Sequence, residues 1–312
     1  MAATIGIDIG GTKVLAVRLE ADGSVANAQK VEVASNDFDA LVRECVGLAD
    51  ALDSGGAPIG VGAAGMVDTD GNVQYAPNLP SLRQVPLQRE LARVSARPVV
   101  VDNDANVAAL GEVAYGAGAG VQDVLFVTLG TGVGGGLVLD GRIYHGAHNF
   151  AGEIGHFRVD PNGPMCACGR RGHWEATASG TALGRMAREL VARGGGAAIL
   201  ELAGGVAEHV QGIHVGQAAR AGDPDALQLL SEYAECVAVG LAGLANILDP
   251  ARIVISGGLV ELGSLLFDPL TTAFLAEIEG SEHRPLIPIV PAALGERAGA
   301  VGAAVLARDL AK

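Results

Sequence analysis

Residues 4–13 read Thr-Ile-Gly-Ile-Asp-Ile-Gly-Gly-Thr-Lys, and this stretch decides the architecture of the first half of the chain. Its isoleucines alternate with small or polar residues, which is typical of a strand with one buried face. The glycine pair then permits a sharp bend, and a second strand (14–19), an Asp-Gly turn and a third strand from residue 25 follow. The stretch therefore predicts a three-stranded meander with a glycine loop at its first bend.

The same unit returns at residues 123–145. A strand (123–129) leads into the loop Gly-Thr-Gly-Val-Gly-Gly-Gly (130–136), and two short strands follow at 137–139 and 142–144, joined by an Asp-Gly turn. Helices and strands alternate behind the first meander, which gives the order βββαβαβα. Two copies of one unit indicate two related domains in an α/β protein.

The domain boundary is placed near residue 105. We expect a small N-terminal lobe of residues 1–105 plus 297–312, because the last helix should pack back onto the first domain. The large C-terminal lobe would be residues 106–296, and it would include a cysteine- and histidine-rich loop at about 152–175.

Composition limits the partners of this chain. Its 312 residues are 49% hydrophobic, and its formal net charge is −14. A strongly acidic chain without a basic patch disfavours nucleic acids and anionic membranes as partners. The most apolar run, 236–248, is interrupted by Asn246 and is shorter than the roughly 18 residues of a membrane helix. The N-terminus has no basic region before Lys13, so we expect a cytoplasmic protein.

Four side chains in the loop have the types of a zinc site: His156, Cys166, Cys168 and His173. Two thiolates and two imidazoles can form a closed tetrahedral site, although this spacing is not that of a zinc finger. The alternative is a pair of buried thiols beside solvated histidines. The clustering of these four residues in a glycine-rich loop favours the zinc site over that alternative.

The glycine loops 10–13 and 130–136 lie at equivalent bends of the two copies. Bends of this kind expose backbone N–H groups that can hold phosphate oxygens, and glycine lets the backbone approach a ligand closely. The alternative is two ordinary tight hairpins. Residues 130–135 also fit G-x-G-x-x-G, but a strand follows them instead of a helix, so a dinucleotide-binding fold is rejected.

Two aspartates have positions that permit catalysis. Asp8 precedes the first loop and could position a hydrated Mg²⁺, although it could equally cap a turn. Asp104 ends the run Asp-Asn-Asp (102–104) and begins a helix predicted over 105–113, where the helix dipole favours a carboxylate. An ordinary N-cap would look the same.

Five motifs, in this order, resemble those of the ROK family of sugar kinases: Asp8-Ile-Gly-Gly-Thr-Lys13, Asp102-Asn-Asp-Ala-Asn106, Leu129-Gly-Thr-Gly-Val-Gly-Gly-Gly136, Gly152-Glu-Ile-Gly-His156, and Cys166-x-Cys-Gly-x-x-Gly-His-x-Glu175. The resemblance spans nearly the whole chain, to residues 298–304, and is greatest to bacterial glucokinases of that family. It implies an actin-like ATPase fold of the ribonuclease H-like type, with two lobes and the active site in the interdomain cleft.

The resemblance also implies an activity, which is ATP-dependent phosphorylation of glucose at its 6-hydroxyl with Asp104 as the general base. Substrate-binding groups would be Gly65, Asn78, Asn103, Asp104, Glu153, His156 and Glu175. Nucleotide-binding groups would be Asp8 near Mg²⁺, together with Gly10, Gly11, Thr12, Lys13, Gly130, Thr131, Gly132, Gly134, Gly257 and Gly258. A structural Zn²⁺ would orient the His156 ring, which could bind the metal through one nitrogen and a sugar oxygen through the other.

The chain departs from the family pattern at one position, because His173 stands where cysteine is usual. Histidine is a competent ligand, so we expect a Cys2His2 site with its ligand charge changed by one unit. Kinases for another hexose or for N-acetylmannosamine, and a glucokinase that uses polyphosphate, are the alternatives. A sugar-responsive transcriptional regulator of the same family is disfavoured, because the first strand begins at residue 4 without a DNA-binding segment. The family favours a homodimer or homotetramer.

Overall fold

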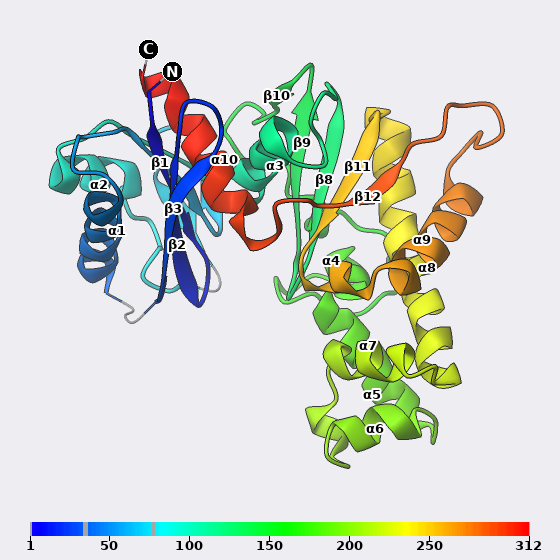
Figure 1. Ribbon diagram of the computed structural model, residues 1–312. Helices are drawn as coiled ribbons and strands as arrows, with labels where there is room; N and C mark the ends of the chain where they lie inside the picture. The colour runs from blue at the N-terminus through cyan, green and yellow to red at the C-terminus, as the bar shows by residue number, and fades with distance from the viewer. Residues whose placement is uncertain (1, 34–36, 77–78, 312) are drawn as a thin grey trace. The chain divides into compact units, whose positions relative to one another are not determined.

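The computed structural model describes residues 2–33, 37–76 and 79–311 (Figure 1). The chain forms two compact units. Unit 1 comprises residues 1–126, 135–152 and 292–312, and unit 2 comprises residues 127–134 and 153–291. The predicted small lobe lies wholly within unit 1, and its boundary at residue 105 stays a prediction.

The sheet of unit 1 has the strand order β3-β2-β1-β4-β7. The meander β1-β2-β3 is antiparallel, whereas β1, β4 and β7 run parallel to one another. These five strands are β1 (Thr4–Ile9), β2 (Lys13–Leu19), β3 (Val25–Glu32), β4 (Ile59–Ala63) and β7 (Val99–Asn103). The predicted meander is confirmed, since residues 10–12 form its first bend.

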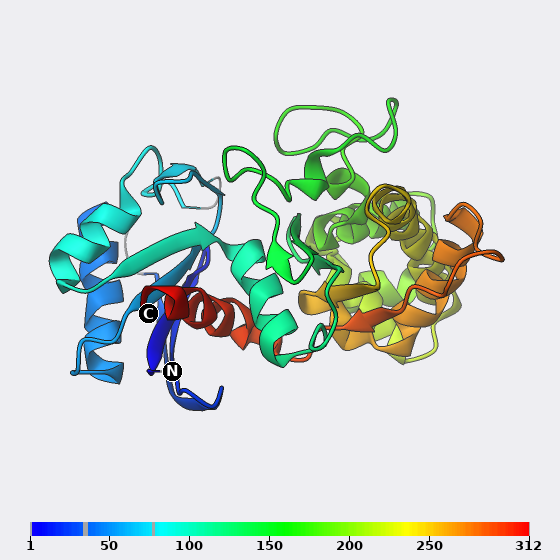
Figure 2. The same cartoon turned by 90° about the horizontal axis from the view of Figure 1, so that it is seen from above.

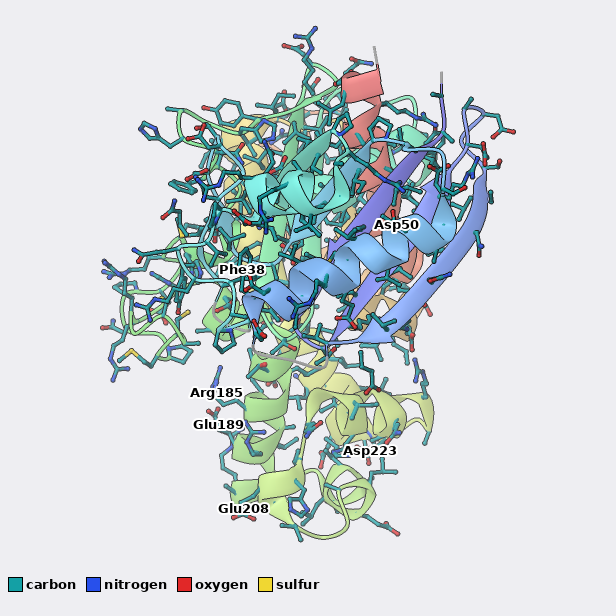
Figure 3. The ribbon with its side chains drawn as sticks, turned by 90° about the vertical axis from the view of Figure 1, so that its left-hand side faces the viewer. Phe38, Asp50, Arg185, Glu189, Glu208 and Asp223 are labelled. Atoms are coloured by element: carbon teal, nitrogen blue, oxygen red, sulfur yellow. The ribbon has the colours of Figure 1, made fainter. Side chains whose placement is uncertain are left out.

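Helices cover both faces of this sheet. Helices α1 (Phe38–Leu52) and α2 (Leu87–Ser95) bury their apolar side chains with the three isoleucines of β1, and Figure 3 shows α1 lying across the strands between the labelled Phe38 and Asp50. Helix α10 (Ala298–Ala307) packs against the other face and against α3 (Asp104–Tyr115), as Figure 2 shows from above. The expectation that the last helix returns to the first domain is therefore confirmed.

A small hairpin, β5 (Met66–Val67) with β6 (Val73–Tyr75), follows β4 and was not predicted. Two- and three-residue strands are too short to show an alternating pattern.

The second sheet has the order β10-β9-β8-β11-β12, which matches the first sheet strand for strand. Its members are β8 (Val124–Leu129), β9 (Val133–Leu139), β10 (Arg142–Ile143), β11 (Arg252–Ser256) and β12 (Ile289–Pro291). The equivalent order confirms the duplication that the two glycine loops indicated.

One predicted boundary in the second copy is wrong. The loop expected over 130–136 ends at Gly132, because β9 already begins at Val133 and includes three glycines. Glycine is depleted in strands, so the pattern placed these residues in a loop. The structure explains them by close packing, since a Cβ on Gly136 would lie 2.9 Å from the carbonyl oxygen of Ala105 in α3.

Helices form most of the rest of unit 2. They are α4 (Glu175–Ala178), α5 (Gly180–Ala192), α6 (Ala197–Leu202), α7 (Gly212–Arg220), α8 (Pro224–Leu248) and α9 (Ser264–Glu277). Short 3-10 turns lie at Ile154–His156, Ala207–His209, Gly258–Leu262, Gly295–Arg297 and Arg308–Ala311.

Helix α8 is the one helix in the described part of the chain that is long and apolar enough to cross a membrane. Half of the most apolar 18-residue stretch of α8 is buried, however, and the helix packs against α4, α5, α7 and α9. A helix that is apolar on nearly every side is also what the core of a large domain requires.

Candidate functional site

Two carboxylates of unit 1 lie close together where parallel strands end. Asp8 of β1 pairs in register with Gly62 of β4, and Asp104 begins α3 directly after β7. A Cβ on Gly62 would lie 3.7 Å from the Oδ1 atom of Asp8 and 3.5 Å from the Cα atom of Asp104. Because this glycine has no side chain, the two aspartates can approach the same small space.

The pKa of Asp8 is raised to about 7. Burial is the largest cause and the negative charge of Asp104 is the next, whereas Lys13 acts in the opposite direction. The first turn of α10 also lies against this carboxylate, since a Cβ on Gly299 would lie 2.6 Å from the Asp8 Cγ atom. A helix N-terminus favours negative charge, and so would a divalent cation. The site is therefore one in which bound Mg²⁺ would relieve electrostatic repulsion.

This raised pKa predicts a pH-dependent effect of Asp8→Asn. A carboxyl with a higher pKa in the folded than in the unfolded state binds its proton more tightly when folded, so its contribution to stability is lost as pH rises from about 4 through about 7. We expect the free energy of unfolding of Asp8→Asn, relative to the unsubstituted protein, to increase by about 2–3 kcal/mol between pH 5 and pH 8. Urea unfolding of both proteins without Mg²⁺ or nucleotide measures this difference in the free energy of unfolding. A difference that is the same at pH 5 and pH 8 would contradict the prediction.

Asn103 is the N-cap of α3. Its Oδ1 atom accepts hydrogen bonds from the backbone N–H groups of Ala105 at 2.8 Å and Asn106 at 3.2 Å. The alternative that made Asp104 the cap is therefore wrong, because Asp104 is the first helical residue. The Nδ2 atom of Asn103 donates to the carbonyl oxygen of Gly65 at 2.9 Å, so these two predicted sugar-binding residues are in contact. Asn78, predicted for the same role, lies outside the described residues.

The first glycine loop is both a tight hairpin and an exposed bend. The N–H of Gly10 donates to the carbonyl oxygen of Lys13 at 3.0 Å, while Gly11 and Thr12 are exposed. The ammonium of Lys13 lies 2.9 Å from a carboxylate oxygen of Glu296. The hairpin alternative and the phosphate-binding interpretation are therefore compatible, since the bend is closed by a hydrogen bond and its two central residues are exposed.

The four predicted metal ligands of unit 2 come together. The ligand atoms of His156, Cys166, Cys168 and His173 all lie within 4.8 Å of one another. The Cys168 Sγ atom is 3.2 Å from Nδ1 of His173, and the Cys166 Sγ atom is 3.9 Å from Nδ1 of His156. Bonds of 2.0–2.3 Å to a tetrahedral zinc imply ligand separations of roughly 3.3–3.8 Å, so this donor set fits the ion with small adjustments.

The histidine and the thiol of this cluster differ in whether they are ready to bind a cation. Burial lowers the pKa of His173, so its imidazole is neutral, which is the form that binds metal. Burial raises the pKa of the Cys166 thiol to about 12, and the thiol donates to the Oε1 atom of Glu175 at 3.3 Å. Zinc would remove that proton, because a coordinating thiol is deprotonated.

His156 has two different environments at its two ring nitrogens. Nδ1 faces Cys166, whereas Nε2 lies 3.9 Å from a carboxylate oxygen of Glu153. The Glu153 side chain is 43% exposed, and desolvation raises its pKa, with a smaller opposing contribution from His156. The ring can therefore bind a metal on one side and turn its other nitrogen, beside an accessible carboxylate, toward a ligand.

Glu175 joins the loop of the cysteine–histidine cluster to the second glycine loop. Its Oε2 atom accepts a hydrogen bond from the N–H of Val133 at 3.1 Å, and its Oε1 atom accepts from Cys166. Gly132 has no side chain at this point, where a Cβ would collide with the Glu175 carboxylate. The residue predicted for sugar hydroxyls thus also supports the predicted phosphate loop.

Unit 2 contains a cavity of about 730 Å³ beside that loop. Its lining comes from the end of β8, from α5 and α7, and from the turn after β11. Of the predicted nucleotide residues, Gly130, Thr131 and Gly258 line it. Pockets for drug-sized ligands usually have volumes of about 300–1,000 Å³, so the cavity is large enough for a nucleoside.

Most of the side chains that line the cavity were not predicted: Thr181, Arg188, Gln211, Ile213, Gln217, Arg220, Leu259, Glu261 and Leu262. A usable signal was present in the glycines of two helices, Gly180 and Gly184 of α5 and Gly212 and Gly216 of α7. Residues four apart share one face of a helix, so each pair leaves a flat face without side chains. Away from the cavity, Arg185 and Glu189 form an ion pair on α5, and both are labelled in Figure 3.

Gly257 is required where the second sheet meets this cavity. Its φ is +97°, and a Cβ would collide with the carbonyl oxygen of Leu129. Only glycine combines this backbone conformation with such a close approach. The turn that presents Gly258 to the cavity therefore depends on it.

Known proteins resemble this chain over its whole length. The sequence profile of the ROK family matches residues 4–310. A glucokinase of Streptomyces coelicolor is 38% identical over 99% of this chain and 98% of its own length. An N-acetylmannosamine kinase of Escherichia fergusonii is 32% identical, with 98% of each chain covered.

A solved structure shows the same fold. The ROK family glucokinase of Streptomyces griseus, crystallised with glucose and AMPPNP, is 39% identical, with 99% of this chain and 100% of that chain covered and a TM-score of 0.85. The five motifs, the duplicated sheets and this agreement have one explanation: the chain belongs to the ROK family and has its two-lobed, actin-like fold.

Proposed function

We propose that this protein transfers the γ-phosphoryl group of ATP to the 6-hydroxyl of glucose. The observation that carries the proposal is the pair of carboxylates, Asp8 and Asp104, in a chain 38–39% identical to glucokinases. One carboxylate can take a proton from a hydroxyl while the other positions a cation. Phosphoryl transfer requires mainly this kind of positioning and charge stabilisation.

Asp104 is the general base. As the sugar 6-oxygen bonds to the γ-phosphorus, its proton passes to the Asp104 carboxylate, the bond from the γ-phosphorus to the bridging oxygen breaks, and ADP leaves. Mg²⁺, when bound near Asp8, supplies charge neutralisation to the phosphates. The N–H groups of the two glycine loops and Lys13 would hold phosphate oxygens, as exposed bends do.

Sugar recognition must use hydrogen bonds, because glucose is neutral. The exposed carboxylate of Glu153 can accept from ring hydroxyls, and Nε2 of His156 can donate to a sugar oxygen. Asn103, Gly65, Asn78 and Glu175 are proposed to complete the sugar site.

A nucleotide is the proposed phosphoryl donor because of the cavity in unit 2. A linear polyphosphate has no base or ribose to occupy about 730 Å³ beside Gly130 and Gly258. An adenosine group could lie between the side chains of α7 and the turn after β11, where Gln217 and Arg220 of α7 and Arg188 of α5 offer polar groups. This observation favours ATP over the alternative donor.

A coupled assay of ADP release tests the function directly. The purified protein is supplied with ATP and glucose, mannose, fructose or N-acetylmannosamine in turn, and with polyphosphate in place of ATP. We expect the highest kcat/KM with glucose and ATP. A higher value with N-acetylmannosamine would replace the proposed substrate, and the 32% identity to kinases of that sugar makes it the second candidate.

Zinc is proposed as a structural ion held by His156, Cys166, Cys168 and His173. Four protein ligands leave no open position, so the ion would shape the loop and the His156 ring rather than activate water.

Metal analysis of the purified protein should find about one zinc per chain, since four ligands form one closed site. Cys168→Ser and His173→Ala should each lower that content severalfold. Cys236→Ser, a thiol of α8 outside the cluster, is the matched control and should leave the zinc content unchanged. Zinc-free protein that is correctly folded would contradict the proposal.

The homodimer or homotetramer, the cytoplasmic location and the absence of nucleic-acid and membrane partners stay predictions. Analytical ultracentrifugation measures the first of them.

A further inference from the structure

Asp102 is a buried carboxylate in the strand that carries the catalytic segment. It lies in β7, two residues before Asp104, and is 4% exposed. Its Oδ2 atom is 2.7 Å from Nε2 of His145. Its Oδ1 atom accepts from the N–H of Asn103 at 2.7 Å, and from Nδ2 of Asn106 at 3.0 Å. The carboxylate therefore ties the end of β7 to the first turn of α3.

His145 belongs to a turn that lies just before Glu153 in the chain. The turn is closed by a hydrogen bond from the N–H of Ala151 to the carbonyl oxygen of His145 at 3.1 Å. Asn149 in this turn has a φ of +67°, and its Nδ2 atom donates to the carbonyl oxygen of Val67 at 3.1 Å and to Asp102 at 3.4 Å. A non-glycine residue in this conformation costs energy, so these contacts determine the path of the turn.

The chemistry of His145 and Asp102 assigns the direction of the hydrogen bond between them. An ionised carboxylate only accepts, so Nε2 of His145 donates. A buried carboxylate also needs compensation of its charge, and the hydrogen bond to Asp102 is the first cause of a raised pKa at His145. The histidine side chain is 38% exposed, so it reaches from the surface to a buried acceptor.

We propose that His145 is a positioning residue for phosphoryl transfer. It contacts neither sugar nor nucleotide in this assignment. By holding Asp102, it holds the backbone of Asn103 and the first turn of α3, and through them the orientation of Asp104. The inference rests on the proposed function, in which Asp104 is the base. Catalysis is sensitive to such displacements, because a shift of about 1 Å can lower the rate about 100-fold.

A double-mutant cycle between His145 and Asp104 tests the inference. We expect His145→Ala to lower kcat about 10- to 100-fold, with KM for ATP changed less than about twofold. In the Asp104→Asn background, the same substitution should lower kcat no further, because the base through which His145 acts is already gone. Equal losses in the two backgrounds would overturn the proposal.

Two conservative variants separate hydrogen bonding from general loss of structure. His145→Gln has its amide nitrogen the same number of bonds from the backbone as Nε2, so it should retain kcat within about threefold. The asparagine side chain of His145→Asn is too short to reach Asp102, so this variant should behave like His145→Ala. If His145→Ala does not fold, His145→Asn takes its place in the double-mutant cycle. Full activity of a folded His145→Asn variant would overturn the proposal. His148→Ala, an exposed histidine of the same turn, is the matched control.

The double-mutant cycle also distinguishes failure of the proposed function from failure of the inference about His145. If Asp104→Asn itself keeps its turnover, the proposed base is wrong. If Asp104→Asn loses turnover and His145→Ala keeps it, the proposed function stands and only the inference about His145 fails.

Discussion

Replacing Asp104 by asparagine should lower kcat by about 10²–10⁴-fold while glucose still binds, because general-base catalysis contributes typically this much. Asparagine has nearly the same shape but cannot accept the proton of the sugar hydroxyl. Its Oδ1 atom can still accept from the N–H of Ala105, as the aspartate does at 2.9 Å, so the first turn of α3 should persist. Initial rates of ADP release give kcat, and calorimetry gives the affinity for glucose.

Asp39→Asn is the matched control for this substitution. Asp39 is an exposed aspartate in the first turn of α1, in the same unit, and has no role in the proposed chemistry. It should leave kcat unchanged. Turnover close to that of the unsubstituted protein in both Asp104→Asn and Asp104→Ala would exclude Asp104 as the base.

Gly302→Ala should be strongly destabilising. Gly302 lies in α10 where this helix crosses α3, and a Cβ there would be 1.6 Å from the carbonyl oxygen of Val107 and 2.7 Å from the backbone nitrogen of Gly111. Both atoms are backbone, so the helices must separate to admit one methyl group. Overpacking a core costs typically 1–3 kcal/mol, and we expect about 3 kcal/mol or more here, measured by urea unfolding.

Gly47→Ala provides the opposite result in the same unit. Gly47 is an exposed position within α1, and a Cβ on it would meet nothing within 4 Å. Alanine has the higher helix propensity, so this variant should be stabilised by about 0.5–1 kcal/mol. A Gly302→Ala protein as stable as the unsubstituted one would show that α3 and α10 do not pack as described.

Local patterns predicted the elements that this chain forms. The alternation of Ile5, Ile7 and Ile9 predicted β1 at its observed bounds, and the repeat at 123–145 predicted the second sheet. The cysteine–histidine cluster was also predictable, because its four residues lie within 18 residues of chain and their chemistry is specific.

Features that depend on distant packing were not predictable in the same way. The three glycines of β9 look like a loop until α3 is seen to lie against Gly136. Asn103, rather than Asp104, caps α3, and adjacent residues of similar propensity gave no means of choosing between them. The side chains around the cavity of unit 2 come from α5, α7 and the turn after β11, which have no common sequence signal beyond their paired glycines.

The amino-acid sequence by itself determined the duplicated order of strands, the glycine bends, the cysteine–histidine cluster and the family, because each depends on residue types at short spacing. Only the tertiary structure decided that burial and the charge of Asp104 raise the pKa of Asp8, that His145 reaches Asp102 across 43 positions, and that Glu175 joins two loops. The physical reason is that burial and charge interactions act through space at a few ångströms, and the folded chain alone determines which groups lie that close.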